Sequence, residues 1–585
     1  MSTTAPNHLD LRTAYFSMEV GLRSDLPTYS GGLGVLAGDT IRSAADLELP
    51  FVAVSLVHRK GYFRQSLGED GVQREQADPW DPAEELLEVG PRVRITIEGR
   101  PVLIRAWEFR VEGVTGHEVP VLLLDTDLEE NTEEDRRITD SLYGGDQRYR
   151  LMQETVLGLG GVELLNALQA DGLETYHMNE GHSALLSLAL MEDELEGIAG
   201  EPAAVDIAEG LAAVRARTVF TTHTPVPAGH DQFELDLVRT VLGERRAALL
   251  EAAECVMDDG VNLTHVALQF SRFTNGVAAR HGAVSRKLFP GAEIHAITNG
   301  VHAATWTGDG FRALFDRHLP GWRNDPFLLR QAITIPLEEF RSAHRLSKEA
   351  LLEHVQRRTG VELSADRFTI AFARRATPYK RADLLMADPG RLAAMSREVG
   401  GLQILYAGKA HPRDAKGKEM IQRIILAGAE AGAGVEVVYL ENYDMELGRL
   451  LTSGADLWLN NPRKPLEASG TSGMKAALNG VPCLSVLDGW WIEGHAEGLT
   501  GWSIDEDWRD ESDSDQEAEA LLEKLESVVL PLFHDDPEGW ARVMRGAVAF
   551  NGSHFHTRRM MLEYLALAYP HRAVPEESEL AGAAG

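Results

Sequence analysis

The segment "LQILYAGKAHPRDAKGKEMIQRIILAGAEAGAGVEVVYLE" spans residues 402–441 and carries the pattern that decides the fold. Two short runs rich in Leu, Ile and Val, at 402–408 and 435–441, flank a helical pattern at 417–432. Short continuous apolar strands separated by helices are typical of a parallel sheet that is covered on both faces. The segment therefore predicts one unit of a doubly wound α/β domain.

The same alternation continues outward on both sides. Apolar runs at 367–373, 455–461 and 481–488 belong to the same predicted sheet, and similar runs recur through residues 13–298. Those within 93–125 lie close together in the sequence and predict an antiparallel insertion. We therefore expect an α/β protein with two Rossmann-like doubly wound domains that face a central cleft, where ligands bind at the carboxyl ends of strands.

The expected domain boundaries follow from these runs. Residues 1–299 should form the N-terminal domain with its antiparallel insertion, and residues 300–548 the C-terminal domain. An apolar-faced helix within 549–572 should pack back on the N-terminal domain. Residues 573–585 should form a frayed tail.

The composition is that of a globular protein with a strongly acidic surface. Its 57 Lys and Arg against 90 Asp and Glu give a net charge of −33, which disfavours nucleic acid and anionic membranes as partners. Two cysteines argue against a disulfide framework or a thiolate metal cluster. The N-terminus shows no signal-peptide pattern, and no apolar run is long enough to cross a bilayer, so we expect a soluble cytoplasmic protein.

A glycine-rich turn, "YSGGLGVLAGD" at 29–39, follows the first predicted strand and opens a helix. Gly32, Gly34 and Ala37 formally fit the G-x-G-x-x-G/A pattern of dinucleotide-binding domains. Such domains also need an acidic residue at the end of the second strand, and here that strand ends in the basic tripeptide at 58–60. The glycines indicate either a tight turn with close helix packing or, more readily, backbone amides that face an anion.

Four cations fall within eight residues of "FARRATPYKRADLL", residues 372–385: Arg374, Arg375, Lys380 and Arg381. The plainer interpretation is the solvated start of a helix. Cations are unfavourable at a helix N-terminus unless an anion is present. In an otherwise acidic protein the cluster favours a phosphate site.

The stretch "EASGTSGMKAALNG", residues 467–480, combines a carboxylate, small hydroxyl and glycine residues, and a single lysine. Thr471, Ser472 and Gly473 precede a short helical run, where backbone amides can bind an anion. An amine one turn away, that of Lys475, can form a Schiff base with an aldehyde cofactor that carries its own phosphate. Taken alone, Lys475 would more often be a surface lysine, but together with Glu467 and the anion sites it indicates a cofactor site.

Taken in order, these motifs resemble those of the α-glucan phosphorylases, which act on glycogen, starch or maltodextrin, in a short prokaryotic form. The resemblance extends over about residues 13 to 500 and includes "AYFSMEVGL", "YGGDQRYRLMQE", "HMNEGHSALL", "FTTHTPVPAGHDQF", "AITNGVHAATW", "YAGKAHP" and "LENYDM". It implies a GT-B fold and pyridoxal 5'-phosphate bound to Lys475. It also implies hexosyl transfer from an α-1,4-glucan to inorganic phosphate, which gives α-glucose 1-phosphate with retention, and it allows a homodimer.

The resemblance implies roles for individual residues. The catalytic residues would be Arg375, Lys380 and Glu467, with Arg375 on the substrate phosphate. The cofactor contacts would be Lys475, Arg374, Lys380, Thr471, Ser472, Gly473 and Tyr443. The substrate contacts would be Gly31, Gly32, Asp146, His223, Arg272, Asn299, Tyr379, Glu467, Ser469 and Gly470, with Asp146 on a mobile gate loop.

Three positions depart from the long forms of this family. Gln147 stands where the long forms have Asn. Asp444 stands where they have a phosphate-binding Arg, and Arg463 is our candidate to replace it. Arg272 stands where they have His. His223 can supply a polar contact to the sugar instead, or it can be a core histidine with satisfied hydrogen bonds.

Two other functions compete with phosphorolysis. A nucleotide-sugar glucosyltransferase of the same fold, such as a glycogen synthase, commonly has a second glutamate eight residues after the first, whereas the residue eight after Glu467 is Lys475. A catalytically silent glucan-binding protein would not need the intact set of charged residues. His177 and His182 do not match the H-E-x-x-H pattern, so no metal site is expected.

Overall fold

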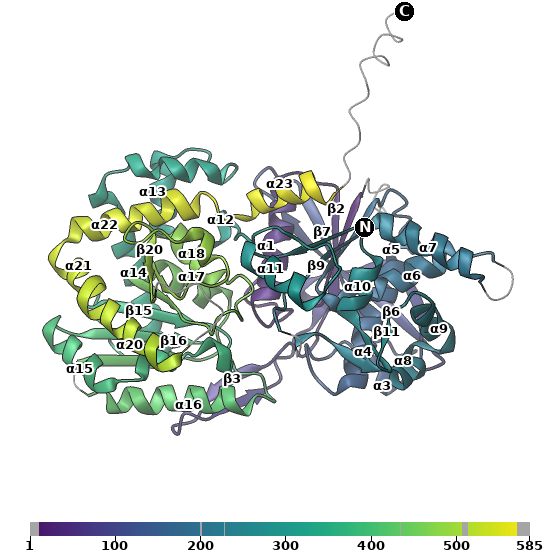
Figure 1. The fold of residues 1–585 in the computed structure, drawn as a ribbon, viewed down its shortest axis with the longest axis horizontal. Coiled ribbons are helices and arrows are strands. Elements are labelled where there is room, and N and C mark those ends of the chain that lie inside the picture. Colours follow the sequence, from purple (N-terminus) through teal and green to yellow (C-terminus); the bar gives the residue numbers. More distant parts are fainter. Residues whose placement is uncertain (1–10, 199–201, 227–228, 433, 506–512, 570–585) are drawn as a thin grey trace, which may run out of the picture.

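The computed structural model describes residues 11–198, 202–226, 229–432, 434–505 and 513–569. Two halves lie side by side, each with a central sheet and surrounding helices (Figure 1). The expected tail at 573–585 lies outside the described residues. None of the described helices is long and apolar enough to cross a membrane.

The N-terminal half is built on a nine-stranded sheet with the order β14-β13-β9-β8-β1-β2-β7-β6-β5. Neighbouring strands run parallel from β14 to β7, and β6 and β5 then add antiparallel, as the runs within 93–125 predict. Every residue of β1 and β2 is buried, as expected for central strands covered on both faces. The strands are β1 (Thr13–Ser17), β2 (Phe51–Leu56), β5 (Leu87–Ile97), β6 (Arg100–Glu112), β7 (Glu118–Asp125), β8 (Thr175–Asn179), β9 (Thr218–Thr221), β13 (Phe273–Gly276) and β14 (His295–Ala296).

The C-terminal half has six parallel strands with the order β17-β16-β15-β18-β19-β20. The chain order reverses between β15 and β18, and such a switch point is where open α/β sheets bind ligands, beyond the carboxyl ends of the strands. The basic cluster follows β15 and the stretch 467–475 follows β18, so the topology brings both to this point. The strands are β15 (Phe368–Ala373), β16 (Leu402–Ala407), β17 (Val435–Leu440), β18 (Leu457–Asn460), β19 (Cys483–Ser485) and β20 (Gly501–Ser503).

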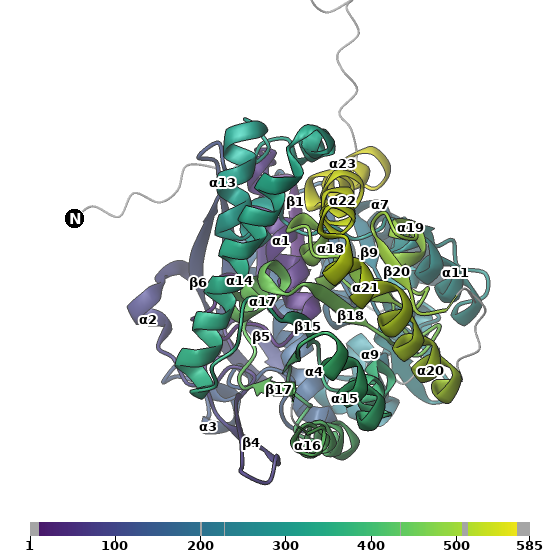
Figure 2. The same cartoon turned by 90° about the vertical axis from the view of Figure 1, so that its left-hand side faces the viewer.

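Helices cover the C-terminal sheet. The helix α14 (Leu337–Thr359) packs against α13 (Asp309–His318) and α17 (Met445–Gly454). In Figure 2 these three helices lie on one side of β15, and α15 (Pro389–Glu398) and α20 (Ser514–Lys524) lie on the other. The predicted fold class, an α/β protein of the GT-B type with two doubly wound sheets, is confirmed.

A hairpin of the N-terminal half, β3 (Arg64–Leu67) and β4 (Gln73–Gln76), reaches the C-terminal half beside α16 (Ala415–Glu430) (Figures 1 and 2). The Gln73 side chain donates to the carbonyl of Ala410 and accepts from its amide, both at 2.9 Å. Gln65 donates to the carbonyl of Gly408 at 3.0 Å. Both glutamines are buried, so these bonds join the two halves at this edge.

The last described helix, α23 (Thr557–Leu567), follows the C-terminal sheet in sequence but packs on α1 (Gly32–Asp46) of the N-terminal half (Figure 1). The Tyr564 hydroxyl shares a hydrogen bond of 2.9 Å with Thr221, at the end of β9. The Tyr569 hydroxyl lies 2.8 Å from a ring nitrogen of His177, in β8. Residues close to the C-terminus are therefore part of the N-terminal core.

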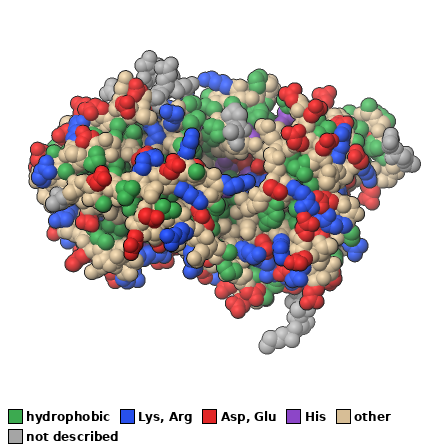
Figure 3. All heavy atoms as spheres, turned by 90° about the horizontal axis from the view of Figure 1, so that it is seen from below, with side chains coloured by type: hydrophobic (Ala, Val, Ile, Leu, Met, Phe, Trp, Pro, Cys, Tyr) green, Lys and Arg blue, Asp and Glu red, His purple; other side chains and the backbone are tan. Residues whose placement is uncertain are grey.

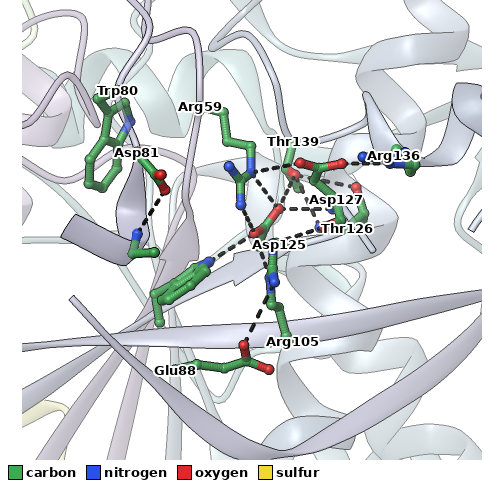
Figure 4. Close-up of polar contacts among 12 residues, drawn as sticks. Arg59, Trp80, Asp81, Glu88, Arg105, Asp125, Thr126, Asp127, Arg136 and Thr139 are labelled. Carbon is green, nitrogen blue, oxygen red and sulfur yellow. Dashed lines mark hydrogen bonds and ion pairs between the residues drawn. The ribbon is translucent and has the colours of Figure 1, made fainter. Parts of the chain in front are cut away.

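A buried carboxylate ties the antiparallel strands to the rest of the N-terminal sheet. Asp125, the last residue of β7, accepts hydrogen bonds from Arg59 at 2.7 and 3.1 Å and from Arg105 and Trp107 at 2.8 Å (Figure 4). Burial by itself raises the pKa of Asp125, but Arg59 and Trp107 lower it to about 2. Arg59 follows β2, where a dinucleotide-binding domain has its ribose-binding acid, so this ion pair also argues against that function.

Candidate active site

The glycine-rich turn lies at the carboxyl end of β1 and begins α1. The buried Glu19 holds it: Oε2 accepts from the amides of Ser30 at 2.5 Å and Gly31 at 3.2 Å, and Oε1 accepts from the Tyr143 hydroxyl at 2.9 Å. Among the described side chains none caps the N-terminus of α1, and the space around Gly32 is open. Glu19 therefore fixes the turn, and the backbone at Gly32, at the start of α1, stays open to an anionic ligand.

Arg375 approaches this turn from the other half. A side chain at Gly31 would come within 3.8 Å of Nη2 of Arg375. Arg375 is exposed, and Tyr62, Glu19 and Tyr143 lie close enough to act on its charge. Figure 3 shows the surface hollowed between the two halves. Within the described part of the chain no hydrogen bond or ion pair holds this guanidinium, which leaves it available to an anion.

Arg374 and Lys380 instead face Glu467. Nη2 of Arg374 lies 2.8 Å from Oε1 of Glu467, and Nζ of Lys380 pairs with Oε2. The three side chains are 6% to 9% exposed. Burial raises the pKa of Glu467, but the two cations overcome this effect and lower it to about 2. The carboxylate is therefore ionised, and an anion that binds these cations has to compete with it.

Arg381, the fourth cation of the cluster, turns away from the other three. Its backbone is left-handed, with φ of +49°. Its guanidinium donates to the carbonyls of Asn461 at 3.0 Å and Pro462 at 2.9 Å, and it pairs with Glu517. Arg381 therefore stabilises the C-terminal half and does not join the anion site.

Asp488, which sequence analysis did not identify, holds the loop that carries Glu467. Its carboxylate is buried and accepts from the amides of Glu467 and Gly489, both at 2.9 Å. A side chain at Gly489 would meet the carbonyl of Ser469 at 2.3 Å, so the two loops are in close contact. Burial, aided by the charge of Glu467, raises the pKa of Asp488 to about 7. Its position, an acid just beyond β19, is the signal that could have identified it.

Lys475 lies on the short helix α18 (Ser472–Leu478) and is 5% exposed. Its Nζ is 3.4 Å from the centroid of the Trp306 ring, and no hydrogen bond or ion pair reaches it from the described residues. Burial lowers the pKa of Lys475 to about 8. A side chain at Gly448 would meet both Tyr443 and Trp306, so the two aromatic rings are neighbours. The amine is therefore buried against the Trp306 ring, with Tyr443 on the far side of Gly448 as the next aromatic neighbour of that ring.

The residues just before Lys475 connect its helix to the loop that lies beside Arg374. The hydroxyls of Thr471 and Ser472 have no partner within the described structure. A side chain at Gly470 would lie 3.5 Å from Nη2 of Arg374. A side chain at Gly473 would lie 2.9 Å from the Trp490 ring, so this glycine is required for packing. Because α18 has seven residues, its dipole is weak, and the hydroxyls with Arg374 offer more to an anion.

His223 and Asn299 lie at the ligand-binding end of the N-terminal sheet, and Asn299 is buried. His223 has satisfied hydrogen bonds: Nε2 lies 2.7 Å from Oδ1 of Asn179, and its amide donates to Glu180 at 2.8 Å. The two expectations for His223, a polar contact to the sugar and a core histidine, therefore both stay open.

Glu180 is a residue that sequence analysis did not identify. It is buried with a φ of +76°, and such strain in a non-glycine residue is characteristic of functional sites.

Arg272 lies at the opposite end of the sheet. It directly precedes β13, and its Nη2 donates to the Thr175 hydroxyl at 3.3 Å, at the start of β8. The glycine-rich turn follows the carboxyl end of β1, which runs parallel to these strands. The two ends of a strand project from opposite edges of a sheet, so this position does not support the expected substrate contact of Arg272.

Three further residues of the expected site, Asp146, Tyr379 and Arg463, are exposed or half-buried. Asp146 is exposed and caps α4 (Gln147–Thr155), where it accepts from the Tyr149 amide at 2.9 Å. The Tyr379 ring is 4.5 Å from Nζ of Lys380, which places Tyr379 beside the cations. The Arg463 side chain is exposed, and its backbone amide donates to Tyr379 at 2.7 Å.

A further charge cluster lies in the N-terminal half, where sequence analysis considered only His182. Ligand atoms of Glu154, His182 and Asp231 lie within 4.8 Å of one another, a spacing that a metal ion could use. Arg150 donates to Asp231 at 3.0 Å and to Glu154 at 3.1 Å and so already supplies positive charge. We interpret the cluster as an ion-pair network.

Sequence similarity identifies the family. The model of the carbohydrate phosphorylase family matches residues 230–497. The chain is 37% identical to the maltodextrin phosphorylase of Thermococcus litoralis and 38% identical to the glycogen phosphorylase of Mycobacterium bovis, over 95% of this chain and 70% of each relative. It is 35% identical to the glycogen phosphorylase of Aquifex aeolicus, over 95% of this chain and 85% of that protein. The resemblance inferred from the motifs is thus confirmed, and the chain belongs to the carbohydrate phosphorylase family.

Proposed function

We propose that this protein is an α-glucan phosphorylase, which uses inorganic phosphate to remove the terminal α-1,4-linked glucose of a glycogen- or maltodextrin-like chain. The observation that carries the proposal is the buried amine of Lys475, which lies eight residues after Glu467 and against the ring of Trp306. A nucleotide-sugar glucosyltransferase, the alternative function, commonly has an acid in that place and has no use for a free buried amine there.

The residues present fit pyridoxal 5'-phosphate as the cofactor. Lys475 would hold its aldehyde carbon covalently, and the lowered pKa supports this because a neutral amine is the nucleophile. Tyr443 would lie beside the cofactor ring. When bound, the cofactor would supply a phosphate group that serves as charge partner and proton donor. The groups that would hold this phosphate are Thr471, Ser472, the amide of Gly473, Arg374 and Lys380.

Arg375 and the amide of Gly32 would bind the substrate phosphate between the two halves, beside Gly31, whose amide already donates to Glu19. The glycosidic C1–O bond breaks and a bond forms between C1 and a phosphate oxygen on the same face. The proton given up by the phosphate ends on O4 of the shortened glucan. The phosphate below the sugar ring stabilises the oxocarbenium character of C1, so the product is α-glucose 1-phosphate with retained configuration.

The loop 467–470 would hold the hydroxyls of the transferred glucose. The Ser469 hydroxyl is buried and has no hydrogen-bond partner among the described groups, as expected of a group that hydrogen-bonds a ligand. Gly470 has a φ of +78°, so a side chain there would be strained and the backbone stays open to the sugar. Glu467 would accept from sugar hydroxyls. Asn299, Tyr379 and His223 would contact the sugar from the other sides.

The proposal extends to the setting of the enzyme. Its partners would be the glucan, inorganic phosphate and glucose 1-phosphate, and the net charge of −33 supports the absence of a nucleic-acid partner. A cytoplasmic location and a homodimer stay predictions, and size-exclusion chromatography with light scattering tests the second.

Assay of glucose 1-phosphate release from maltooligosaccharides and phosphate separates the candidate functions. The purified protein should release it and should show the near-ultraviolet absorbance of bound pyridoxal 5'-phosphate. Borohydride should fix a pyridoxyl group on Lys475 and on no other lysine, and Lys475→Ala should lose both absorbance and activity. A colourless protein that transfers glucose from a nucleotide sugar supports the alternative function, and binding without either activity supports a silent glucan-binding protein.

A further inference from the structure

Asp39 is a buried carboxylate with no role in the function proposed above. It lies on α1 and is 1% exposed. Its Oδ2 accepts from the indole Nε1–H of Trp306 at 2.7 Å and from the amide of His302 at 3.1 Å. Its Oδ1 pairs with Arg42 at 3.4 Å. The carboxylate therefore fixes the rotation of the Trp306 ring from the N-terminal half of the molecule.

Trp306 in turn contacts Lys475, whose Nζ lies 3.4 Å from the ring centroid. The two backbones are also joined, because Nδ2 of Asn479 donates to the carbonyls of Trp306 at 2.9 Å and Lys475 at 2.8 Å. Oδ1 of Asn479 accepts from the amide of Gly308 at 2.6 Å. Asn479 thus sets the separation of the two chain segments, and Asp39, bonded to the edge of the ring, sets the plane of the face that the amine contacts.

The charges that act on Lys475 also come from α1. Asp39 raises the pKa of Lys475 and Arg42 lowers it, while burial is the larger effect and lowers it. Helix α1 begins at the turn of Gly31 and Gly32, about two turns before Asp39. One rigid helix therefore presents amides to the phosphate side of the cleft and a carboxylate to the lysine side.

We propose that Asp39 is a positioning residue for Lys475. Through Trp306 it fixes the direction and the surroundings of the amine. The inference rests on the proposed function in so far as that amine holds the cofactor.

The first test measures cofactor retention. Pyridoxal 5'-phosphate is removed with hydroxylamine and titrated back while the near-ultraviolet absorbance is followed. Asp39→Ala should raise the apparent dissociation constant by about tenfold to a hundredfold, because the indole N–H loses a charged acceptor. Asp39→Asn, which keeps an oxygen acceptor, should stay within about threefold of wild type. Asp46→Ala is the matched control: it lies on the same helix and binds the His302 ring, and it should leave retention unchanged.

The second test asks whether Asp39 acts through Trp306. In a Trp306→Phe background, Asp39→Ala should have little further effect on retention, because the indole N–H is already absent. An equal loss in both backgrounds, or wild-type retention in Asp39→Ala, overturns the proposal. If Asp39→Ala does not fold, Trp306→Phe decides alone, and unchanged retention in that variant overturns the proposal.

A third measurement separates this inference from the proposed function. Lys475 is labelled with an acylating reagent in cofactor-free protein and quantified by peptide mass spectrometry. Asp39→Ala should change the labelling rate of Lys475 at least about threefold, and Asp39→Asn should restore it. A changed rate in a protein that never binds pyridoxal 5'-phosphate supports the positioning role and refutes the proposed function. If wild type binds the cofactor normally and Asp39→Ala leaves both labelling and retention unchanged, the proposed function is supported and the positioning role is overturned.

Discussion

Glu467→Gln tests the arrangement of charges in the cleft. Glu467 is the anion between Arg374 and Lys380, and all three side chains are almost fully buried. Glutamine keeps the volume of the side chain and an acceptor oxygen but removes the negative charge. Two neighbouring buried cations then lose their shared counter-ion.

The cost can be estimated by two routes. The pKa of Glu467 is about 2, against an ordinary value of about 4.3, and each unit corresponds to about 1.4 kcal/mol, so the charged form contributes roughly 3 kcal/mol more than the neutral one. Because this pKa is lowered, the contribution is complete above about pH 4.3 and is lost as the pH falls towards 2. Removal of one partner of a buried ion pair costs about 3–5 kcal/mol in other proteins. We expect a loss of at least about 3 kcal/mol at pH 7.

The assay is urea denaturation of the cofactor-free protein with and without inorganic phosphate. Phosphate that binds Arg374 and Lys380 restores the missing negative charge, so it should stabilise Glu467→Gln more than wild type. Glu526→Gln, which removes an exposed partner of Arg391, is the control and should cost less than about 1 kcal/mol.

Two results would refute this reasoning. Equal stability of Glu467→Gln and wild type without phosphate contradicts the argument from buried charge. Equal stabilisation of both proteins by phosphate contradicts the assignment of Arg374 and Lys380 to an anion site.

Three further variants probe other features. Arg375→Ala should retain the cofactor but lower kcat/KM for phosphorolysis by about 30- to 1,000-fold, and near-normal turnover at low phosphate would contradict its role. Asp125→Asn should lower the free energy of unfolding by about 2 kcal/mol at pH 7 and by much less near pH 2. Because the pKa of Asp125 is lowered, the stabilisation by its charge is lost as the pH falls from about 4 to 2. Urea titrations at both pH values check this. Tyr564→Phe should cost about 1 kcal/mol, because it removes hydrogen bonds to Thr221 and Asn275, and limited proteolysis should then cut near α23 faster than in wild type.

Sequence patterns predicted the sheets because buried parallel strands need continuous apolar runs, and those runs are local. The strands β15 to β19 all fall on such runs. The approach of Arg375 to Gly31 could be anticipated from topology and resemblance, because both follow carboxyl ends of strands at a switch point.

Side-chain direction could not be predicted in the same way. Arg381 is adjacent to Lys380 in sequence, but a left-handed backbone turns it into the C-terminal half. The assignment of Arg272 came from motif alignment, which does not show at which end of β13 the residue lies. Asp39 and Trp306 are more than 250 residues apart, and their hydrogen bond depends on how the two halves pack.

The placement of α23 has a consequence for biosynthesis. The N-terminal half is completed by side chains such as Met560, Tyr564 and Tyr569, which are synthesised only after the strands of the C-terminal sheet. A nascent chain that ends before them has to carry an apolar gap against α1, β1 and β2 while the C-terminal half is still being made. The N-terminal half therefore cannot complete its folding before the C-terminal half has been synthesised. If the protein were divided into two polypeptides between the halves, both would have to be expressed together.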